Sequence, residues 1–193
     1  SGKTNLCLLA AVRVAESGKK VIIIDTEGGI AVERIKQLTI DYDRILGNFL
    51  FFQPLTFEEQ QGMFERLNNL LSQDIGLIVV DSISMLYRLE LGKADAIFET
   101  NSALARQIAI LVEITRSKKI PVLITNQVYA DFGNKDKVKM VGGDLLKYGS
   151  KCLIELVKLG GNQNSGVVLR KHRYIASGEE RAFKIVNKGI EEV

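Results

Sequence analysis

The sequence predicts an α/β fold, in which helices cover both faces of a twisted and mostly parallel sheet. Short, uninterrupted aliphatic runs, typical of strands buried on both faces, alternate along the chain with stretches of helical period. After about residue 143 the apolar residues alternate with polar ones between turn signals, which indicates an antiparallel C-terminal extension. At 193 residues, 46% of them hydrophobic, the chain fits one domain (1–193) with a substantial core.

The first half of the chain begins with a predicted helix. Apolar side chains recur at helical spacing over residues 4–17, and Gly18 follows as a C-cap. Residues 20–25 are then a β-branched run, which predicts a buried strand ending in Asp25. Residues 56–59 have the pattern of a capping box, so we expect a second helix to start there.

The second half repeats this alternation. An aliphatic strand is expected over 77–81, a long helix over about 94–117, and a third buried strand over 121–125. Because the carboxyl ends of parallel strands form the ligand-binding edge of such a sheet, residues at these ends are candidate site residues. Later strands are expected to be antiparallel and to close one edge of the sheet, at about 152–156, 167–169 and 183–185.

The bulk composition excludes several classes of protein. No apolar run is long enough to cross a bilayer, and no basic leader is present, so we expect a cytoplasmic protein without a membrane partner. The formal charge is +3, with an acidic first half and a basic second half, which permits an anionic partner on the C-terminal part. Cys7 and Cys152 lie in apolar segments and are expected to be buried thiols.

The first residues have the pattern of a phosphate-binding loop. Gly2, Lys3 and Thr4 lead into a helix and match the second half of G-x-x-x-x-G-K-[ST], in which backbone amides cradle phosphates. Lysine in this motif meets the terminal phosphates, and the hydroxyl meets magnesium. The upstream glycine and its strand are not in this sequence, so we expect the chain to start inside the motif, with Ser1 and Asn5 also beside the nucleotide.

Carboxylates follow two of the predicted strands. Asp81 comes directly after four buried aliphatic residues, as a Walker B carboxylate must if it is to orient magnesium and its waters. Residues 25–29 end the neighbouring strand with two further acidic residues, Asp25 and Glu27, and two glycines. A carboxylate here could polarise an attacking water, whereas the alternative is a turn-forming acidic cluster.

The order and spacing of these motifs resemble the RecA and RadA recombinase family over nearly the whole chain. The resemblance rests on residues 25–29 followed by Glu33-Arg34, on Asp81-Ser82 and Tyr87-Arg88, and on residues 125–128. It implies a RecA-like P-loop NTPase core. The end of the chain, residues 169–174 and 183–191, is more similar to the archaeal RadB branch of this family.

The resemblance implies a role for each matching residue. Lys3 and Thr4 would hold ATP and Mg²⁺, Asp81 would support the metal, and Glu27 would be the catalytic base. Arg34 matches an arginine that stacks on adenine, and Gln127 a glutamine that senses the γ-phosphate and reorganises the next DNA loop. The alternatives are a surface arginine and an amide that caps a turn.

Two segments correspond to the DNA-binding loops of the family. Residues 129–141 match the second loop and are expected to contact DNA through Phe132, Lys135, Lys137 and Lys139. The first loop is expected at residues 88–95, where Arg88 is the candidate DNA contact. This segment lacks the Gly-Arg-Gly stretch of RadA, and Tyr148 stands where the recombinases carry a histidine, so the resemblance does not by itself imply strand exchange.

The sequence therefore predicts an ATP-binding DNA recombination and repair protein with weak, DNA-stimulated ATPase activity. The expected partners are single-stranded or branched DNA, a RadA-type recombinase and further copies of the same chain. The alternative is a KaiC-like regulatory ATP-binding module that acts through protein partners without DNA contact. A P-loop kinase of small molecules fits less well, because only Arg106 and Arg116 lie near the place of its arginine-rich lid.

Overall fold

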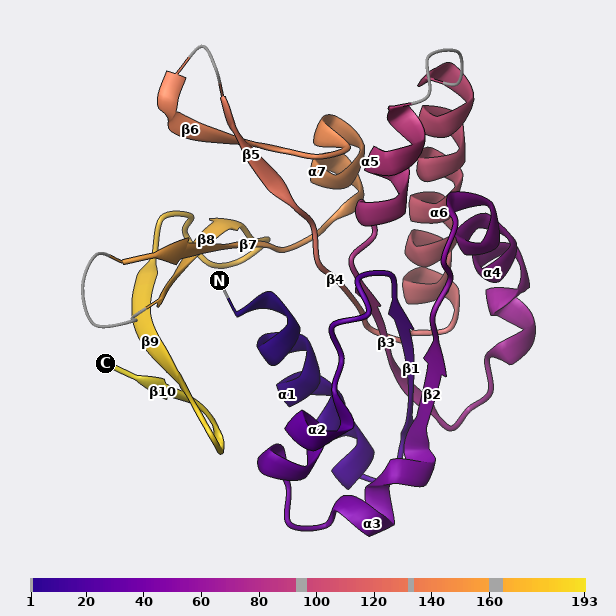
Figure 1. Cartoon of the computed structure of the whole chain (residues 1–193), viewed down its shortest axis with the longest axis vertical. Coiled ribbons are helices and arrows are strands. Elements are labelled where there is room, and N and C mark those ends of the chain that lie inside the picture. Colours follow the sequence, from indigo (N-terminus) through magenta and orange to yellow (C-terminus); the bar gives the residue numbers. More distant parts are fainter. Residues whose placement is uncertain (1, 93–96, 132–133, 160–164) are drawn as a thin grey trace.

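The computed structural model describes residues 2–92, 97–131, 134–159 and 165–193. Its centre is a four-stranded parallel sheet with the strand order β2-β1-β3-β4 (Figure 1). The four strands are β1 (Lys20–Asp25), β2 (Phe49–Phe52), β3 (Ile75–Asp81) and β4 (Val122–Ile124). The predicted parallel sheet is confirmed, and β1 and β3 are buried as expected, whereas all three residues of β4 are partly exposed.

Helices cover both faces of this sheet. On one face lie α1 (Lys3–Glu16), α2 (Val32–Leu38) and α3 (Tyr42–Ile45), which η1 (Leu46–Asn48) connects to β2. On the other lie α4 (Phe57–Leu70), α5 (Met85–Leu91) and α6 (Ile97–Ser117) (Figure 1). Successive strand residues serve the two cores in turn, because side chains alternate across a strand: Val21 packs with α1, whereas Ile22 packs with α4 and α6.

The C-terminal part forms a separate layer. A hairpin of β5 (Val128–Asp131) and β6 (Asn134–Met140) leads into α7 (Gly143–Gly149). A second four-stranded sheet follows, antiparallel and in the order β10-β9-β8-β7. Its strands are β7 (Leu153–Lys158), β8 (Ser165–Lys171), β9 (Glu180–Val186) and β10 (Gly189–Glu192).

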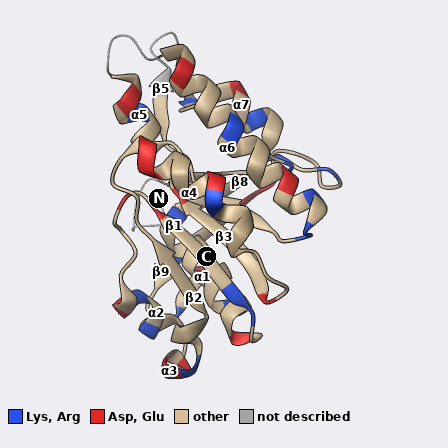
Figure 2. Ribbon diagram, turned by 90° about the vertical axis from the view of Figure 1, so that its right-hand side faces the viewer, with Lys and Arg blue, Asp and Glu red and all other residues tan. Residues whose placement is uncertain are grey.

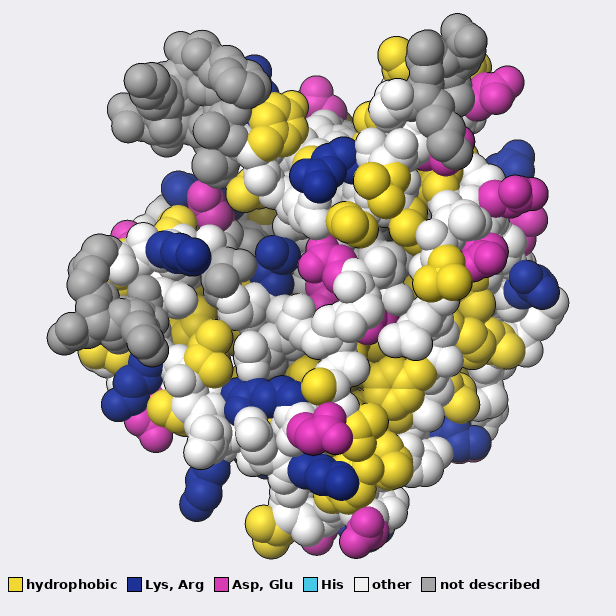
Figure 3. All heavy atoms as spheres, in the orientation of Figure 1, with side chains coloured by type: hydrophobic (Ala, Val, Ile, Leu, Met, Phe, Trp, Pro, Cys, Tyr) yellow, Lys and Arg dark blue, Asp and Glu magenta, His cyan; other side chains and the backbone are white. Residues whose placement is uncertain are grey.

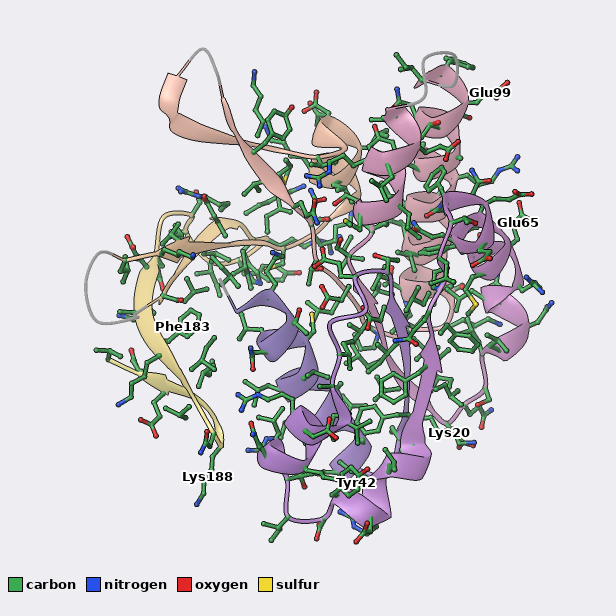
Figure 4. The ribbon with its side chains drawn as sticks, viewed as in Figure 1. Lys20, Tyr42, Glu65, Glu99, Phe183 and Lys188 are labelled. Carbon is green, nitrogen blue, oxygen red and sulfur yellow. The ribbon has the colours of Figure 1, made fainter. Side chains whose placement is uncertain are left out.

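The expectation that these last strands close an edge of the parallel sheet was wrong. The hairpin and α7 carry the chain away from β4, so the later strands pair only with one another. The second sheet instead packs on the start of α1. A Cβ added to Gly2 would lie 3.2 Å from the Cδ1 of Ile185 and 3.6 Å from the ring of Phe183, both on β9. Phe183 projects from its strand toward that helix start (Figure 4).

The predicted helix start at Thr56 is confirmed, and its capping contacts are visible. The Thr56 side chain accepts a hydrogen bond of 3.1 Å from the backbone N–H of Glu59. The Glu59 side chain in turn accepts a hydrogen bond of 2.7 Å from the backbone N–H of Leu55, one residue before the cap. Sequence reasoning did not predict β2, α2, α3, α5 or α7, which are all short.

The two cysteines differ in their surroundings. Cys7 is buried, as expected, but Cys152 is exposed, because it precedes β7 at the surface of the second sheet.

Acidic and basic side chains are mixed along the helices seen from the side (Figure 2). None of the helices in the described ranges combines the length and apolar content that spanning a bilayer requires.

Candidate functional site

The carboxyl ends of three parallel strands and the start of α1 meet at one edge of the central sheet (Figure 1). Asp25 and Asp81 are register partners at the ends of β1 and β3, and Thr125 directly follows β4. Backbone bonds join these ends, since the N–H of Thr26 donates to the Asp81 carbonyl over 2.9 Å. In the space-filling view, acidic and basic side chains lie together near the centre of this face (Figure 3).

Asp81 is held by two hydroxyl groups. Its side chain is 1% exposed, and Thr4 Oγ1 donates to Asp81 Oδ2 over 2.6 Å, while the Thr125 hydroxyl donates to Oδ1. A buried carboxylate needs such partners, because burying it without them costs several kcal/mol or more. The pair of Thr4 and Asp81 puts a hydroxyl beside a carboxylate, and both are the oxygen ligands that Mg²⁺ prefers.

The helix that carries Thr4 begins at a glycine with a left-handed backbone. Gly2 has φ 86° and ψ 8°, and α1 follows for 14 residues. A helix of this length presents unpaired backbone N–H groups and the positive end of its dipole at its start, which together favour a phosphate. The left-handed φ explains the need for glycine, since a Cβ is strained there.

The pKa of the Cys7 thiol depends on the charges around this helix start. Burial, the largest cause, and the nearby Asp81 carboxylate raise the pKa of the Cys7 thiol to about 12, while Lys3 acts in the opposite direction. Asp81 and Lys3 therefore both lie within electrostatic reach of one buried sulfur, one turn into α1. Such a thiol stays protonated at neutral pH, which agrees with the absence of any predicted chemistry at Cys7.

Asp25 and Glu27 have different functions in the fold. Asp25 is 1% exposed and accepts hydrogen bonds from the backbone N–H groups of Glu27 (3.1 Å), Gly28 (2.8 Å) and Ile30 (3.2 Å). It shapes the turn after β1, as the turn-forming alternative predicted for this cluster. Glu27 is exposed at the same turn, so it is the carboxylate of the two that solvent can reach.

Two side chains hold the Glu27 carboxylate. Ser82 Oγ donates to Glu27 Oε1 over 2.8 Å, and Gln127 Nε2 donates to the same oxygen over 2.9 Å. Ser82 follows Asp81 through a cis peptide bond and is itself fully buried. The amide oxygen of Gln127, Oε1, is buried and has no hydrogen-bond partner among the described residues. Glu27 and Gln127, predicted from separate motifs, thus meet in one contact.

Gln127 also connects this contact to the hairpin. The N–H of Val141, just after β6, donates to the Gln127 carbonyl over 3.0 Å. Asn126 Nδ2 donates to the Val141 carbonyl over 2.8 Å, and β5 begins at the next residue after Gln127. A displacement of the hairpin base would therefore act directly on the residue that holds Glu27.

Arg34 makes five hydrogen bonds. Its Nε donates to Asn5 Oδ1 over 2.7 Å, and its Nη atoms donate to the Gln37 side chain. The remaining acceptors are backbone carbonyls of the β9–β10 turn, on Val186, Asn187 and Gly189. Five N–H groups are all that a guanidinium carries, so its in-plane donors are used and a stacked adenine would have to lie on its face.

The predicted DNA contacts lie on the other side of Gln127. The second loop is a β-hairpin, whose β6 contains Lys135, Lys137 and Lys139 at alternate positions, and Lys139 is exposed. Of the predicted first loop, Arg88 lies in the last turn of α5, where it is exposed, and residues 93–95 fall outside the described residues. Phe132, a predicted DNA contact, and Ser1, predicted to lie beside the nucleotide, fall outside the described residues.

Several site residues received no role from the sequence. Ser82 and Thr125 complete the contacts of Glu27 and Asp81, and their signals were their position at a strand end and their place in the motifs that resemble the family. In the part of the chain that the structure describes, no cluster of three or more His, Cys, Asp or Glu side chains is placed to hold a metal ion. A metal at Thr4 and Asp81 would therefore need ligands from a bound phosphate or water as well.

A parallel sheet with a Gly-Lys-Thr helix start, a strand-end aspartate and a separate glutamate is typical of the RecA-like class of P-loop cores. The Rad51 family model matches residues 1–193, so the chain belongs to the Rad51 family. It shares 40% identity with a DNA repair and recombination protein RadB of Methanobrevibacter smithii, covering 98% of this chain and 82% of that protein.

Other RadB proteins match the chain with similar identity and coverage. RadB of a Methanococcus maripaludis strain is 42% identical, with 98% and 86% of the two chains covered, and RadB of Methanocaldococcus jannaschii is 39% identical, with 98% and 87% covered. A solved crystal structure of the RadB recombinase superposes with a TM-score of 0.82 at 34% identity, over 100% of this chain and 86% of that one. The predicted RadB branch and RecA-like fold are confirmed, and the family supports a role in DNA recombination and repair.

Proposed function

We propose that this chain is an ATPase unit that binds ATP with Mg²⁺ and contacts single-stranded or branched DNA. Its hydrolysis is slow and stimulated by DNA, and it acts as an accessory to a RadA-type recombinase. The observation that carries this proposal is the contact of Glu27 with Gln127, because it joins a candidate catalytic base to the first residue before the hairpin.

The phosphates of ATP bind at the start of α1. The amides after Gly2 and the ammonium group of Lys3 face the negative charge, with Asn5 beside them in the first turn of α1. Thr4 and Asp81 hold the metal through their oxygens, and their 2.6 Å contact supports this pairing. Mg²⁺ supplies neutralisation of the charge on the β- and γ-phosphates when it is bound. The adenine lies against the face of Arg34.

Glu27 acts as the general base for hydrolysis. Its carboxylate accepts a proton from the attacking water, whose oxygen forms a bond to the γ-phosphorus as the bond to ADP breaks. The Ser82 hydroxyl holds the carboxylate in place over 2.8 Å. The second donor, Gln127, competes with water for the same oxygen, so the resting arrangement lowers the activity of the base.

DNA relieves this competition through the hairpin. Lysines at alternate positions of β6 neutralise phosphates, and the bonds of Val141 with Asn126 and Gln127 transmit the change to the base of the hairpin. A slow rate in isolation agrees with RecA-type hydrolysis, in which a neighbouring protomer supplies charge stabilisation in the transition state.

The test is ATP turnover by the full chain, measured with and without single-stranded DNA at saturating ATP. We expect slow phosphate release that rises when DNA is added, and loss of both rates when magnesium is chelated. A rate of ATP turnover that does not change when DNA is added, together with the absence of DNA binding, would support the KaiC-like regulatory module instead. Membership in the Rad51 family favours the DNA-dependent activity over that alternative.

A further inference from the structure

A cavity of about 760 Å³ lies between α5, the start of α6, the base of the hairpin and α7. None of the residues described so far as holding the nucleotide lines it. Its walls include three tyrosines, an arginine and an amide, namely Tyr87, Tyr129, Tyr148, Arg88 and Asn101. In Figure 3, hydrophobic and basic side chains adjoin one another in the upper part of the face, below the hairpin.

The three tyrosines are unequally exposed. Tyr148 on α7 is 73% exposed and Tyr129 on β5 is 48% exposed, whereas Tyr87 on α5 is buried at the bottom of the cavity. Large aromatic rings left open to solvent beside a cavity mark a binding surface more often than a structural one. Two rings are therefore available at the rim, above a third at the floor.

The floor of the cavity is a fixed polar arrangement. The Tyr87 hydroxyl donates to Asn101 Oδ1 over 2.6 Å. Burial raises the pKa of Tyr87, and the neighbouring Tyr129 raises it further, so the hydroxyl remains a neutral donor. Because the Asn101 oxygen is engaged, its NH₂ group is the part of the amide left to donate to a ligand. Arg88, at the same wall, carries only donors.

We propose that this cavity receives one unstacked nucleobase of a single DNA strand, with the ring of Tyr148 or Tyr129 stacked on the base. This inference rests on the proposed DNA binding and assigns it a base-contacting site. Rings offer stacking surfaces to any base, and the donors of Asn101 and Arg88 match the ring nitrogens and carbonyl oxygens at a base edge. The volume falls within the range of small-molecule pockets.

Two observations favour a nucleobase over an apolar peptide as the occupant. The cavity lies at the base of the hairpin whose β6 carries three lysines, so a phosphate backbone held there would bring its bases to the cavity. The NH₂ group of Asn101, which the bond from Tyr87 does not use, would face an aliphatic side chain without a partner, which costs free energy.

The same site connects to the catalytic residues. Val141 lines the cavity, and it is bonded to the carbonyl of Gln127, whose side chain holds Glu27. A base in the cavity therefore acts on Glu27 through Val141 and Gln127, as DNA phosphates at the lysines do. The effect of the cavity depends on the presence of the base, whereas the effect of the lysines depends on phosphate charge.

The experiment compares two fluorescein-labelled oligonucleotides of equal length and charge, one of deoxythymidine and one with abasic sites throughout. We expect the full chain to bind the first about 5- to 100-fold more tightly in fluorescence anisotropy, because stacking contributes roughly 1–3 kcal/mol per base. Tyr148→Ala should weaken binding of the thymidine strand by about tenfold and leave the abasic strand unchanged. Tyr129→Ala should act in the same direction.

Tyr174→Ala is the matched control, because that ring is 87% exposed and does not line the cavity. Tyr174→Ala should change neither the affinity for the thymidine strand nor the affinity for the abasic strand. If Tyr148→Ala and Tyr129→Ala leave the preference for bases intact, or weaken both strands equally, the cavity does not hold a base, although DNA binding itself stands. If the parent protein binds neither oligonucleotide, both the cavity proposal and the proposed DNA function are wrong.

Discussion

The edge of the parallel sheet and the hairpin face differ in how their polar groups are arranged. At the sheet edge, Asp25 and Asp81 are each 1% exposed, and each of their carboxylate oxygens accepts at least one hydrogen bond. On the hairpin face, Tyr148 and Lys139 are exposed. Chemistry on a phosphate needs groups held in one geometry before the substrate arrives, whereas contacts to a flexible strand are spread over adaptable side chains. The two faces meet at Gln127.

The largest expected effect is on the sheet edge, in the variant Glu27→Gln. The amide keeps the size of the side chain and one oxygen for the bonds from Ser82 and Gln127, but it cannot take a proton from water. Turnover should fall about 100- to 10,000-fold, while ATP binding stays within a factor of about two. Phosphate release at saturating ATP gives the rate. Glu33→Gln, an exposed neighbour, is the control, and a wild-type rate in Glu27→Gln would place the base elsewhere.

Lys3→Ala should affect binding before it affects chemistry. Loss of the ammonium group leaves triphosphate charge uncompensated, which weakens ATP binding by at least about tenfold, or on the order of 1–3 kcal/mol. Titration with a fluorescent ATP analogue measures the change. Lys118→Ala, an exposed lysine after α6, should bind as the parent does. Equal affinities in all three proteins would remove the phosphate-binding assignment.

Arg34→Lys tests whether the hydrogen bonds of Arg34 fasten the β9–β10 turn of the second sheet to the sheet edge. A lysine offers three donors in place of five, so most bonds to the β9–β10 turn would be lost. We expect the free energy of unfolding in urea to fall by roughly 1–3 kcal/mol. Arg13→Lys, which changes an arginine in an exposed ion pair, should lose less than about 0.5 kcal/mol. Matching losses in the two variants would mean that Arg34 does not fasten the turn.

The smallest effect is expected on the hairpin face, where replacement of Lys135, Lys137 and Lys139 by alanine removes three phosphate contacts. The logarithmic salt slope of single-strand binding should flatten by roughly 2 units, since each contact contributes about 0.7. ATP binding should not change. Alanine at three exposed lysines elsewhere, Lys36, Lys118 and Lys188, is the control and should keep the parental slope. A triple variant with the parental slope would mean that the hairpin does not track the phosphate backbone.

The sheet edge was more predictable from the sequence than the hairpin face, for a local reason. A strand buried on both faces must be aliphatic throughout, so the polar residue that ends it is visible in the sequence; Asp25, Asp81 and Thr125 were all located in this way. The strand β2 was not located, because four residues at a sheet edge are too short for a periodic signal. The hairpin was expected as a loop, because its lysines and aspartates mask the pairing of β5 with β6.

The sequence by itself determined the alternation of strands and helices, the helix start at Thr4 and the resemblance to the RecA and RadA family, because these depend on local order and spacing. Only the tertiary structure decided that Asp25 shapes a turn while Glu27 meets Ser82 and Gln127. It also decided that Arg34 reaches a turn more than 150 residues later, and that three tyrosines surround one cavity. Such contacts join residues far apart in the chain, and their geometry follows from packing and register, which no local pattern specifies.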